Sequence, residues 1–203
     1  MRAREAADVR RQSLIDAAAA TLAEHGVAGT SVRSICARAG VSPGLLTHYF
    51  AGVSALIAET YRVTAERVAA TLETAVEQAG SDPRARAAAF LTASFRPPIA
   101  EPALFATWLA FWSAVKADPA IAAIHRQTYQ NYRGQLEQLL RSCGISPVEA
   151  GAAALALSAL VDGLWLELSL DPGPVSHDGA SDIVVRWLDV TLERREATSP
   201  APL

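Results

Sequence analysis

The sequence between residues 30 and 50, TSVRSICARAGVSPGLLTHYF, constrains the fold most, because it predicts two short helices on either side of one glycine. Thr30 or Ser31 can cap the first helix, which extends to about residue 39 and places its apolar residues on one face. Gly40 then suits the left-handed conformation that commonly ends a helix. Two short helices separated in this way are typical of a helix-turn-helix.

The second helix of this stretch is predicted to begin at Pro43. Ser42 can accept a hydrogen bond from an unpaired backbone N–H group, and proline at the first helical position lacks only a donor that the first turn does not use. Leu46 and Phe50 share one face, while the rest of the helix carries small or hydrogen-bonding groups. Such a surface fits the major groove of DNA. A helical hairpin in an unrelated all-α domain would explain the glycine turn, but it does not require so short and polar a second helix.

The remainder of the chain also predicts helices, since alanine and leucine are abundant and strand-like alternation is scarce. A capping residue followed by proline marks three helix starts, at Asp82, Asp118 and Ser146. We expect an all-α protein with a three-helix DNA-binding domain over residues 1–52 and a helical ligand-binding and dimerisation domain over residues 53–198. The predicted helices span residues 8–25, 31–39, 43–50, 54–79, 83–95, 103–117, 119–142, 147–170 and 177–196.

The charge distribution favours a nucleic-acid contact in the N-terminal part. The net charge is −3, but residues 1–50 contain six arginines and four acidic residues, so this part carries +2. We expect residues 1–6 to form a mobile arm, although solvated charge unrelated to DNA would look the same. The arginines that can reach phosphates from the arm or the first helix are Arg2, Arg4, Arg10 and Arg11.

Cysteine content and hydropathy predict a cytoplasmic protein. The two cysteines show no metal-ligand spacing, which favours a reduced protein without a metal or another cofactor. The polar N-terminus does not resemble a signal peptide. The most apolar region, residues 150–170, contains Asp162 and Glu167, each of which would oppose membrane insertion by roughly 2.5 to 3.5 kcal/mol. We therefore expect a buried helix there and no membrane contact.

Aromatic residues recur at helical spacing in the C-terminal part, and Asp162 precedes Trp165 by three positions. Rings together with a carboxylate favour a site for an organic cation, because each desolvated ring contributes about 0.5 to 2 kcal/mol by cation–π attraction. Aromatic stripes are also common in an ordinary core, so periodicity alone leaves both interpretations open. The candidate ligand-binding residues are Phe105, Trp108, Trp112, Tyr129, Tyr132, Asp162 and Trp165.

The run from Gly40 to Phe50, GVSPGLLTHYF, resembles the recognition unit of TetR-type transcriptional repressors. The segments 107–112 (TWLAFW) and 160–166 (LVDGLWL) resemble the BetI subgroup, which represses the choline-to-betaine operon. The resemblance covers most of residues 10–195 and implies nine helices, a homodimer, a palindromic operator in double-stranded DNA and a small-molecule effector, such as a quaternary ammonium or a polyamine. The residues implied to contact or approach DNA are Ser31, Arg33, Pro43, Gly44, Leu45, Thr47, His48 and Tyr49.

The resemblance also implies that the last two predicted helices form the dimer interface. Alanine and leucine make residues 152–157 apolar nearly all round, and the small alanines permit a partner helix to approach closely. Ile183, Val184 and Trp187 would extend this surface. A monomer that buries the same helix internally is the alternative.

Other interpretations remain open at the level of the sequence. The turn over residues 51–54 lacks the lysine usual in the family, and Glu167 stands where the subgroup tends to have arginine. The effector can therefore be choline, betaine, a polyamine or, in a regulator of an efflux or catabolic operon, a lipophilic drug or metabolite. An enzyme is disfavoured, because the four histidines are scattered and no HExxH, GxSxG, GxGxxG or P-loop pattern occurs. A structural adaptor would leave the outward polar face of residues 47–49 unexplained.

Overall fold

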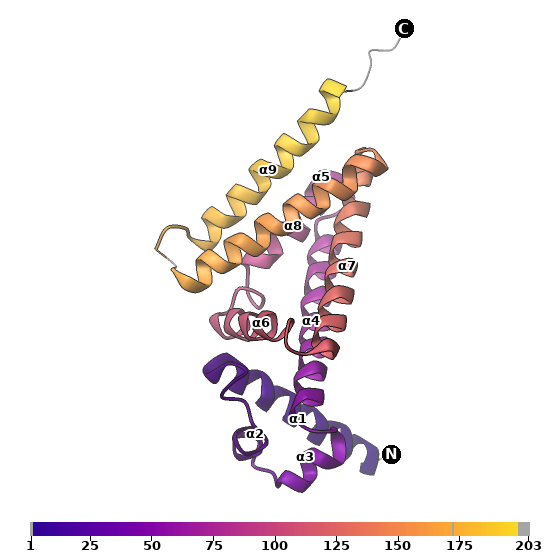
Figure 1. Ribbon diagram of the computed structural model, residues 1–203. Helices are drawn as coiled ribbons and strands as arrows, with labels where there is room; N and C mark the ends of the chain where they lie inside the picture. Colours follow the sequence, from indigo (N-terminus) through magenta and orange to yellow (C-terminus); the bar gives the residue numbers. More distant parts are fainter. Residues whose placement is uncertain (1, 172, 199–203) are drawn as a thin grey trace. The chain divides into compact units, whose positions relative to one another are not determined.

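The computed structural model describes residues 2–171 and 173–198, with the side chains of residues 7–171 and 173–193. Within these ranges the chain forms nine α-helices, one short 3₁₀ helix and no strand, which confirms the predicted all-α fold (Figure 1). The elements are α1 (Arg2–His25), α2 (Val32–Ala39), α3 (Pro43–Tyr49), α4 (Val53–Gln78), α5 (Pro83–Thr92), η1 (Ala93–Phe95), α6 (Pro102–Ala114), α7 (Pro119–Ser142), α8 (Pro147–Leu170) and α9 (His177–Thr198).

The three predicted helix starts are confirmed by their caps. The carboxylate of Asp82 accepts the backbone N–H of Ala85 at 2.8 Å, and that of Asp118 accepts two N–H groups of the first turn of α7. The hydroxyl of Ser146 accepts the N–H of Glu149 at 3.4 Å and donates to its side chain at 2.6 Å. Each cap satisfies donors that the first turn of the helix cannot pair internally.

Three local expectations were wrong. α1 begins at Arg2 rather than near residue 8, so residues 2–6 continue the helix instead of forming a mobile arm; this segment consists of alanine, arginine and glutamate and contains no glycine or proline to stop the helix. The hydroxyl of Ser42 makes no capping bond to α3, whose first turn closes through the Ser42 carbonyl and the Leu45 amide, 3.0 Å apart. The helix predicted over residues 103–117 ends at Ala114.

The chain divides into two compact units, Met1–Arg67 with Pro102–Thr128, and Val68–Glu101 with Tyr129–Leu203. The helices α4 and α7 each contribute to both units. The predicted boundary near residue 52, between a DNA-binding and a ligand-binding domain, is a functional division that these contact-based units do not test. It stays a prediction.

The first unit is built around the core of α1, α2 and α3. The predicted inward residues of α1 are buried, as are Ile35 and Cys36 of α2 and Leu46 of α3. Helix α6 packs on α1, where the hydroxyl of Thr107 donates to the carbonyl of Ala19 at 3.3 Å. The buried α1 residues are Leu14, Ile15, Ala18 and Leu22. This core holds α3 at the surface of the unit.

In the second unit α9 lies beside α8 and α5 (Figure 1). Arg84 of α5 donates to both carboxylate oxygens of Asp189 of α9, at 2.7 and 2.8 Å. Among the described residues, α8 alone is long and apolar enough to cross a membrane, and 39% of its apolar segment is buried within the chain. Uncovered apolar surface on a helix is also typical of a contact with another protein, so this helix alone does not indicate a membrane span.

Candidate DNA-binding surface and ligand site

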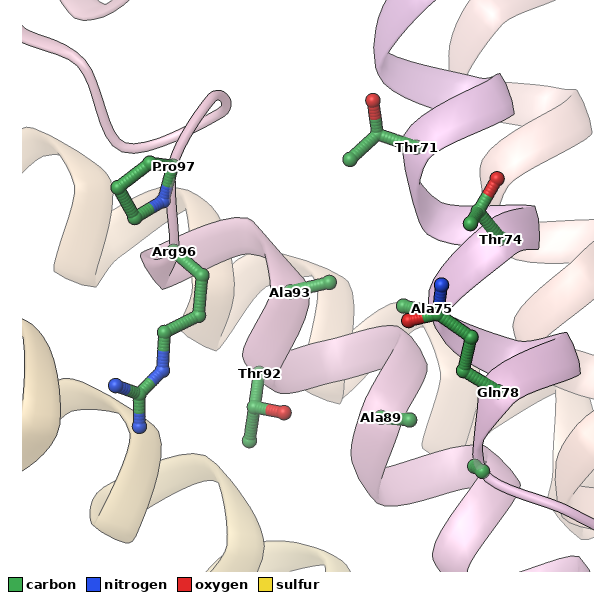
Figure 2. Close-up of a pocket in the computed structure, with 10 residues that line it drawn as sticks. Thr71, Thr74, Ala75, Gln78, Ala89, Thr92, Ala93, Arg96 and Pro97 are labelled. Carbon is green, nitrogen blue, oxygen red and sulfur yellow. The ribbon is translucent and has the colours of Figure 1, made fainter.

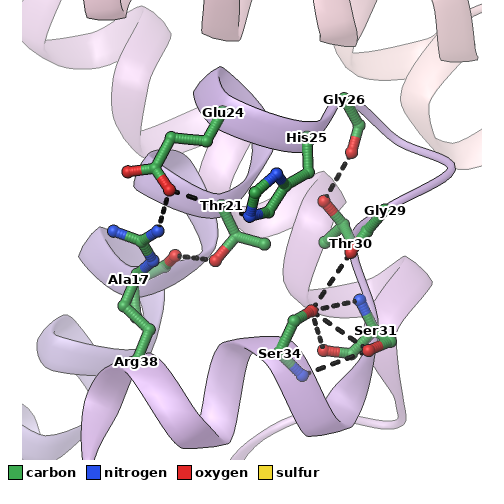
Figure 3. A network of polar contacts seen from close by, with 10 residues as sticks. All are labelled: Ala17, Thr21, Glu24, His25, Gly26, Gly29, Thr30, Ser31, Ser34 and Arg38. Carbon is green, nitrogen blue, oxygen red and sulfur yellow. Dashed lines mark hydrogen bonds and ion pairs between the residues drawn. The ribbon is translucent and has the colours of Figure 1, made fainter.

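The turn from α1 into α2 is held by side-chain hydroxyl groups (Figure 3). The Thr30 hydroxyl donates to the carbonyl of Gly26 at 2.7 Å. The Ser31 hydroxyl accepts the N–H of Ser34 at 3.1 Å, and the Ser34 hydroxyl accepts the N–H of Ser31 at 2.9 Å. This reciprocal pair is a capping box, so Ser31 both begins α2 and lies on its exposed end.

Gly40 makes the turn between α2 and α3, as predicted. Its φ of 65° and ψ of 33° lie in the left-handed region, and its N–H donates to the carbonyl of Cys36. Val41 then packs against the core of the unit. The chain thereby reverses within four residues and presents α3 outward.

The eight predicted DNA-contacting residues lie on α2, on α3 or at their starts. The hydroxyl of Thr47 donates to the carbonyl of Gly44 at 3.1 Å, and the Thr47 side chain is exposed. The rings of His48 and Tyr49 meet edge-on with centroids 5.0 Å apart, and Tyr49 also packs against the core. Exposed members of the set are Ser31, Arg33, Pro43, Gly44, Thr47 and His48, while Leu45 and Tyr49 are half-buried.

The arginines of the first unit differ in what they contact. Arg33 is exposed and has no ion pair or hydrogen bond among the described residues. Arg38 pairs with Glu24 of α1 (Figure 3). Arg11, which the sequence suggested for phosphates, instead pairs with Glu59 of α4. The phosphate contact expected for Arg11 stays a prediction, and the side chains of residues 2 and 4 lie outside the described ones.

The predicted ligand residues fall into both units. In the first unit, the Trp108 ring meets Tyr61 edge-on at 5.5 Å, and Tyr61 stacks on Phe111 at 4.3 Å. Phe105 and Trp108 are 5% and 6% exposed, so both are core residues of this unit. The Trp112 Nε1–H group is buried without a hydrogen-bond partner among the described residues.

In the second unit the remaining four predicted residues come together. The Tyr129 hydroxyl of α7 donates to the carboxylate of Asp162 of α8 at 3.0 Å. Trp165 Nε1–H donates to the carbonyl of Ser94 at 2.9 Å, and the side chain of that serine lies beside the Tyr132 hydroxyl. We call Tyr129, Tyr132, Asp162 and Trp165 the aromatic–carboxylate cluster.

Burial controls the protonation of this cluster. Desolvation raises the pKa of Asp162 to about 6, although the hydrogen bond from Tyr129 and the charge of Arg133 oppose the rise. Burial, and then the negative charge of Asp162, raise the pKa of Tyr132. The Tyr132 hydroxyl is buried and makes no hydrogen bond of normal geometry within the described part of the chain. Within the described residues, the Asp162 carboxylate is therefore only partly compensated by positive charge, and the Tyr132 hydroxyl has no hydrogen-bond partner of normal geometry.

Two residues that contact the aromatic–carboxylate cluster were not predicted from the sequence. The Arg133 guanidinium lies over the Tyr129 ring, 5.8 Å from its centroid, and Phe90 of α5 lies 4.9 Å from the Tyr132 ring. Arg133 follows Tyr129 by four positions, a spacing that places two helical residues side by side. This spacing could have predicted from the sequence that Arg133 lies beside Tyr129. Glu167, by contrast, is exposed and lies outside the cluster.

A separate hollow of about 530 Å³ lies in the second unit, between α4 and α5. Figure 2 shows Thr71 and Thr74 of α4 across from Ala89 of α5 and Ala93 of η1. Its lining contains no aromatic ring, no carboxylate and none of the predicted ligand residues. The lining residues are Thr71, Thr74, Ala75, Gln78, Ala79, Ala89, Thr92, Ala93, Arg96 and Pro97.

The outer faces of α8 and α9 carry large exposed apolar side chains. Leu155 is 53% exposed and Trp187 is 51% exposed. Val184 is fully buried within the subunit, so its predicted place on a dimer surface is wrong: it faces inward, where α9 lies against α8, α5 and η1. The other exposed apolar residues of these helices are Val148, Leu166, Leu170 and Ile183.

Two family models match the chain. The model of bacterial regulatory proteins of the tetR family matches residues 14–60, which contain α2 and α3. The model of the C-terminal part of BetI-type transcriptional repressors matches residues 83–193. The chain belongs to the TetR family. Its C-terminal part is of the BetI type, and the resemblance inferred from residues 40–50, 107–112 and 160–166 is confirmed.

Similar proteins agree with this assignment to the TetR family. The HTH-type transcriptional regulator BetI of Burkholderia thailandensis is 32% identical over 93% of this chain and 96% of its own length. A putative transcriptional regulator from Pseudomonas aeruginosa is 40% identical, with a TM-score of 0.84 over 93% of this chain and 94% of that one. A putative regulator from Saccharomonospora viridis, solved in complex with choline, shares the fold at 17% identity and a TM-score of 0.76, over 88% of this chain and 95% of that one. The chain is a TetR-family transcriptional regulator and not an enzyme.

Proposed function

We propose that the protein acts in the cytoplasm as a homodimer that binds a palindromic DNA operator, with DNA affinity controlled by a small organic cation. In this proposal the two copies of α3 enter successive major grooves, about 34 to 36 Å apart. Effector binding and DNA binding are then reciprocally coupled, because each ligand changes the affinity for the other by the same factor.

The observation that carries the DNA-binding proposal is the exposed face of α2 and α3. Arg33 has no described partner that would hold it away from a base edge, and an arginine can form two parallel hydrogen bonds with guanine. His48 and the exposed hydroxyl-bearing side chain of Thr47 extend the same surface. The family lysine is absent from residues 51–54, so this chain lacks one phosphate contact expected in the family, and contacts from α2 and α3 have to supply more of the affinity.

Substitution of Arg33 tests this interface. A fluorescent duplex bearing an operator, selected from random sequences with the wild-type protein, would be titrated and followed by anisotropy. We expect Arg33→Ala to weaken binding by roughly 10- to 100-fold and to relax base preference at one position of each half-site. Arg38→Ala is the matched control, because Arg38 is held by Glu24. Equal binding by wild type and Arg33→Ala would exclude this contact.

The dimer proposal rests on the apolar surface of α8 and α9. Leu155, Leu166 and Trp187 are large side chains that are 39% to 53% exposed on two neighbouring helices. Alanines 152 and 156 are also exposed on α8 and permit another helix to approach closely. A two-fold axis through this surface would place the same residues of both copies opposite one another and cover them.

The effector proposal rests on the aromatic–carboxylate cluster. A cation beside Asp162 would compensate the buried charge that raises its pKa, and the rings of Tyr129, Tyr132 and Trp165 provide faces for cation–π contact. The regulator from Saccharomonospora viridis, which shares the fold, was solved with choline. The hollow between α4 and α5 offers neither a carboxylate nor a ring to such a ligand.

The effector is tested by adding candidate ligands to the protein–operator complex. Choline, betaine, spermidine and tetraphenylphosphonium would be titrated while anisotropy reports DNA binding. We expect at least one cation to shift operator affinity in wild type, and Asp162→Asn to weaken that response by about tenfold or more. Glu167→Gln, an exposed neighbour on α8, is the control. A response that Asp162→Asn leaves intact would place the effector site elsewhere.

A further inference from the structure

We infer that Arg11 is a positioning residue that holds the end of α3 in place for DNA binding, and that it makes no contact with phosphates. Its side chain extends from α1 toward the junction of α3 and α4. There it pairs with Glu59 of α4, and its guanidinium lies over the ring of Phe50, 5.4 Å from the centroid. One side chain thus joins the helix before the helix-turn-helix to the residue that ends α3.

Phe50 is the C-terminal cap of α3, and its N–H donates to the carbonyl of Leu46 at 2.9 Å. Because α3 is only seven residues long, it has little stability of its own and takes its orientation from side-chain packing. Its inward anchors are Leu46 and Phe50, both buried in the core of the unit. A cation held over the outer face of the Phe50 ring therefore restrains the helix end that carries Thr47 and His48.

Glu59 is what keeps Arg11 in this position. Hydrogen bonds from Arg62 and then Arg11, together with their charges, lower the pKa of Glu59 to about 2, so it is ionised throughout the physiological range. Arg62 donates to the same carboxylate at 2.6 and 2.9 Å. Since Glu59 keeps Arg62 when Arg11 is removed, the loss of Arg11 leaves no unpaired charge and the domain should still fold.

Arg10 provides a matched comparison, because the sequence predicts that it, too, can reach a phosphate. It precedes Arg11 on α1 and is likewise an arginine, but it is exposed and has no described partner. A phosphate contact and a positioning contact differ in their salt dependence, because each phosphate contact contributes about one unit to the slope of log affinity against log salt concentration. A positioning residue lowers affinity without changing that slope.

The test compares Arg11→Ala, Arg10→Ala and wild type on the selected operator duplex, from 50 to roughly 300 mM salt. We expect Arg11→Ala to lower affinity about five- to tenfold at every salt concentration with an unchanged slope, as the loss of one cation–π and ion-pair anchor implies. Amide hydrogen exchange should become faster at residues 45–50 of Arg11→Ala and remain unchanged in α2. Arg11→Lys should recover part of the affinity, because it retains the charge that pairs with Glu59.

Two outcomes overturn the inference. A slope reduced by about one unit in Arg11→Ala would show that Arg11 contacts a phosphate. Wild-type affinity in Arg11→Ala would show that the anchor does not matter for binding. If Arg11→Ala fails to fold, Arg11→Gln replaces it: this variant keeps most of the side-chain length but removes the charge that pairs with Glu59 and lies over the Phe50 ring, and the same two criteria apply.

Discussion

The Tyr129 hydroxyl donates a 3.0 Å hydrogen bond to the carboxylate of Asp162, which joins α7 to α8 inside the second unit. This bond stabilises the ionised carboxylate but does not offset its burial, since the pKa of Asp162 remains raised to about 6. The folded protein therefore binds the proton of this carboxyl group more tightly than a water-exposed aspartate does, although the group is mostly ionised at pH 7. Its ionised form costs stability at neutral pH, and the cationic effector proposed above would offset this cost by pairing with it.

The first prediction concerns stability against pH. The pKa of Asp162 is raised from 3.8 to about 6 in the folded state, so the fold binds the proton more tightly than the unfolded chain does. Stability is then greatest below about pH 4 and falls as pH rises to about 6, by about 3 kcal/mol for this group. We expect Asp162→Asn to remove this dependence and to be more stable than wild type at pH 7.5. Urea unfolding at pH 4, 5, 6 and 7.5 measures it, and equal stability of the two proteins at pH 7.5 would contradict it.

The second prediction concerns Arg133. Its guanidinium occupies the face of the Tyr129 ring that an organic cation would use, and its charge partly compensates Asp162. Arg133→Gln removes a competing cation, so we expect the affinity for a cationic effector to rise by roughly three- to tenfold. Isothermal titration calorimetry measures the change, with the cation that shifts operator affinity in the anisotropy experiment. A fall in affinity would instead indicate an effector with an anionic group, such as betaine.

The third prediction separates two glycines of the helix-turn-helix. Gly40 has φ of 65°, and an added Cβ would meet no atom within 4 Å, so the cost of Gly40→Ala is the left-handed backbone itself, about 1 to 2 kcal/mol. Gly44 lies in the first turn of α3, where Gly44→Ala should raise stability by about 0.5 to 1 kcal/mol. If Gly44 faces the DNA backbone as predicted, the same variant binds the operator more weakly. Thermal unfolding and anisotropy together test both; unchanged operator affinity in Gly44→Ala would place this residue away from DNA.

The fourth prediction concerns the dimer. We expect the double variant Leu155→Glu and Trp187→Glu to be monomeric at micromolar concentration, because a dimer would have to bury the new charges without partners. Val9→Glu is the control, since Val9 is a comparably exposed apolar residue on α1. Sedimentation velocity gives the oligomeric state. A dimeric double variant would move the interface away from α8 and α9.

Much of the fold was determined by signals within a few residues of each other. Gly40 ends α2 because a residue without Cβ is needed at a positive φ, and the Ser146–Pro147 pair begins α8 because the serine hydroxyl accepts the N–H of Glu149 and proline suits the first helical position. These signals act through backbone groups within one turn of the helix. They can be read from the sequence without knowing what the helix packs against, and the family motif in α3 is equally local.

Only the tertiary structure decided which side chains meet over long separations. The sequence does not reveal that Arg11 pairs with Glu59, because the two residues are 48 positions apart. Val184 and Trp187 are equally apolar by sequence, yet the packing of α9 buries the first and leaves the second half exposed. The neighbours of Asp162 were likewise set by the packing of α7 against α8, which brings Tyr129 to its carboxylate. Helix periodicity reveals which residues share a face, but the partner of that face depends on how distant helices pack.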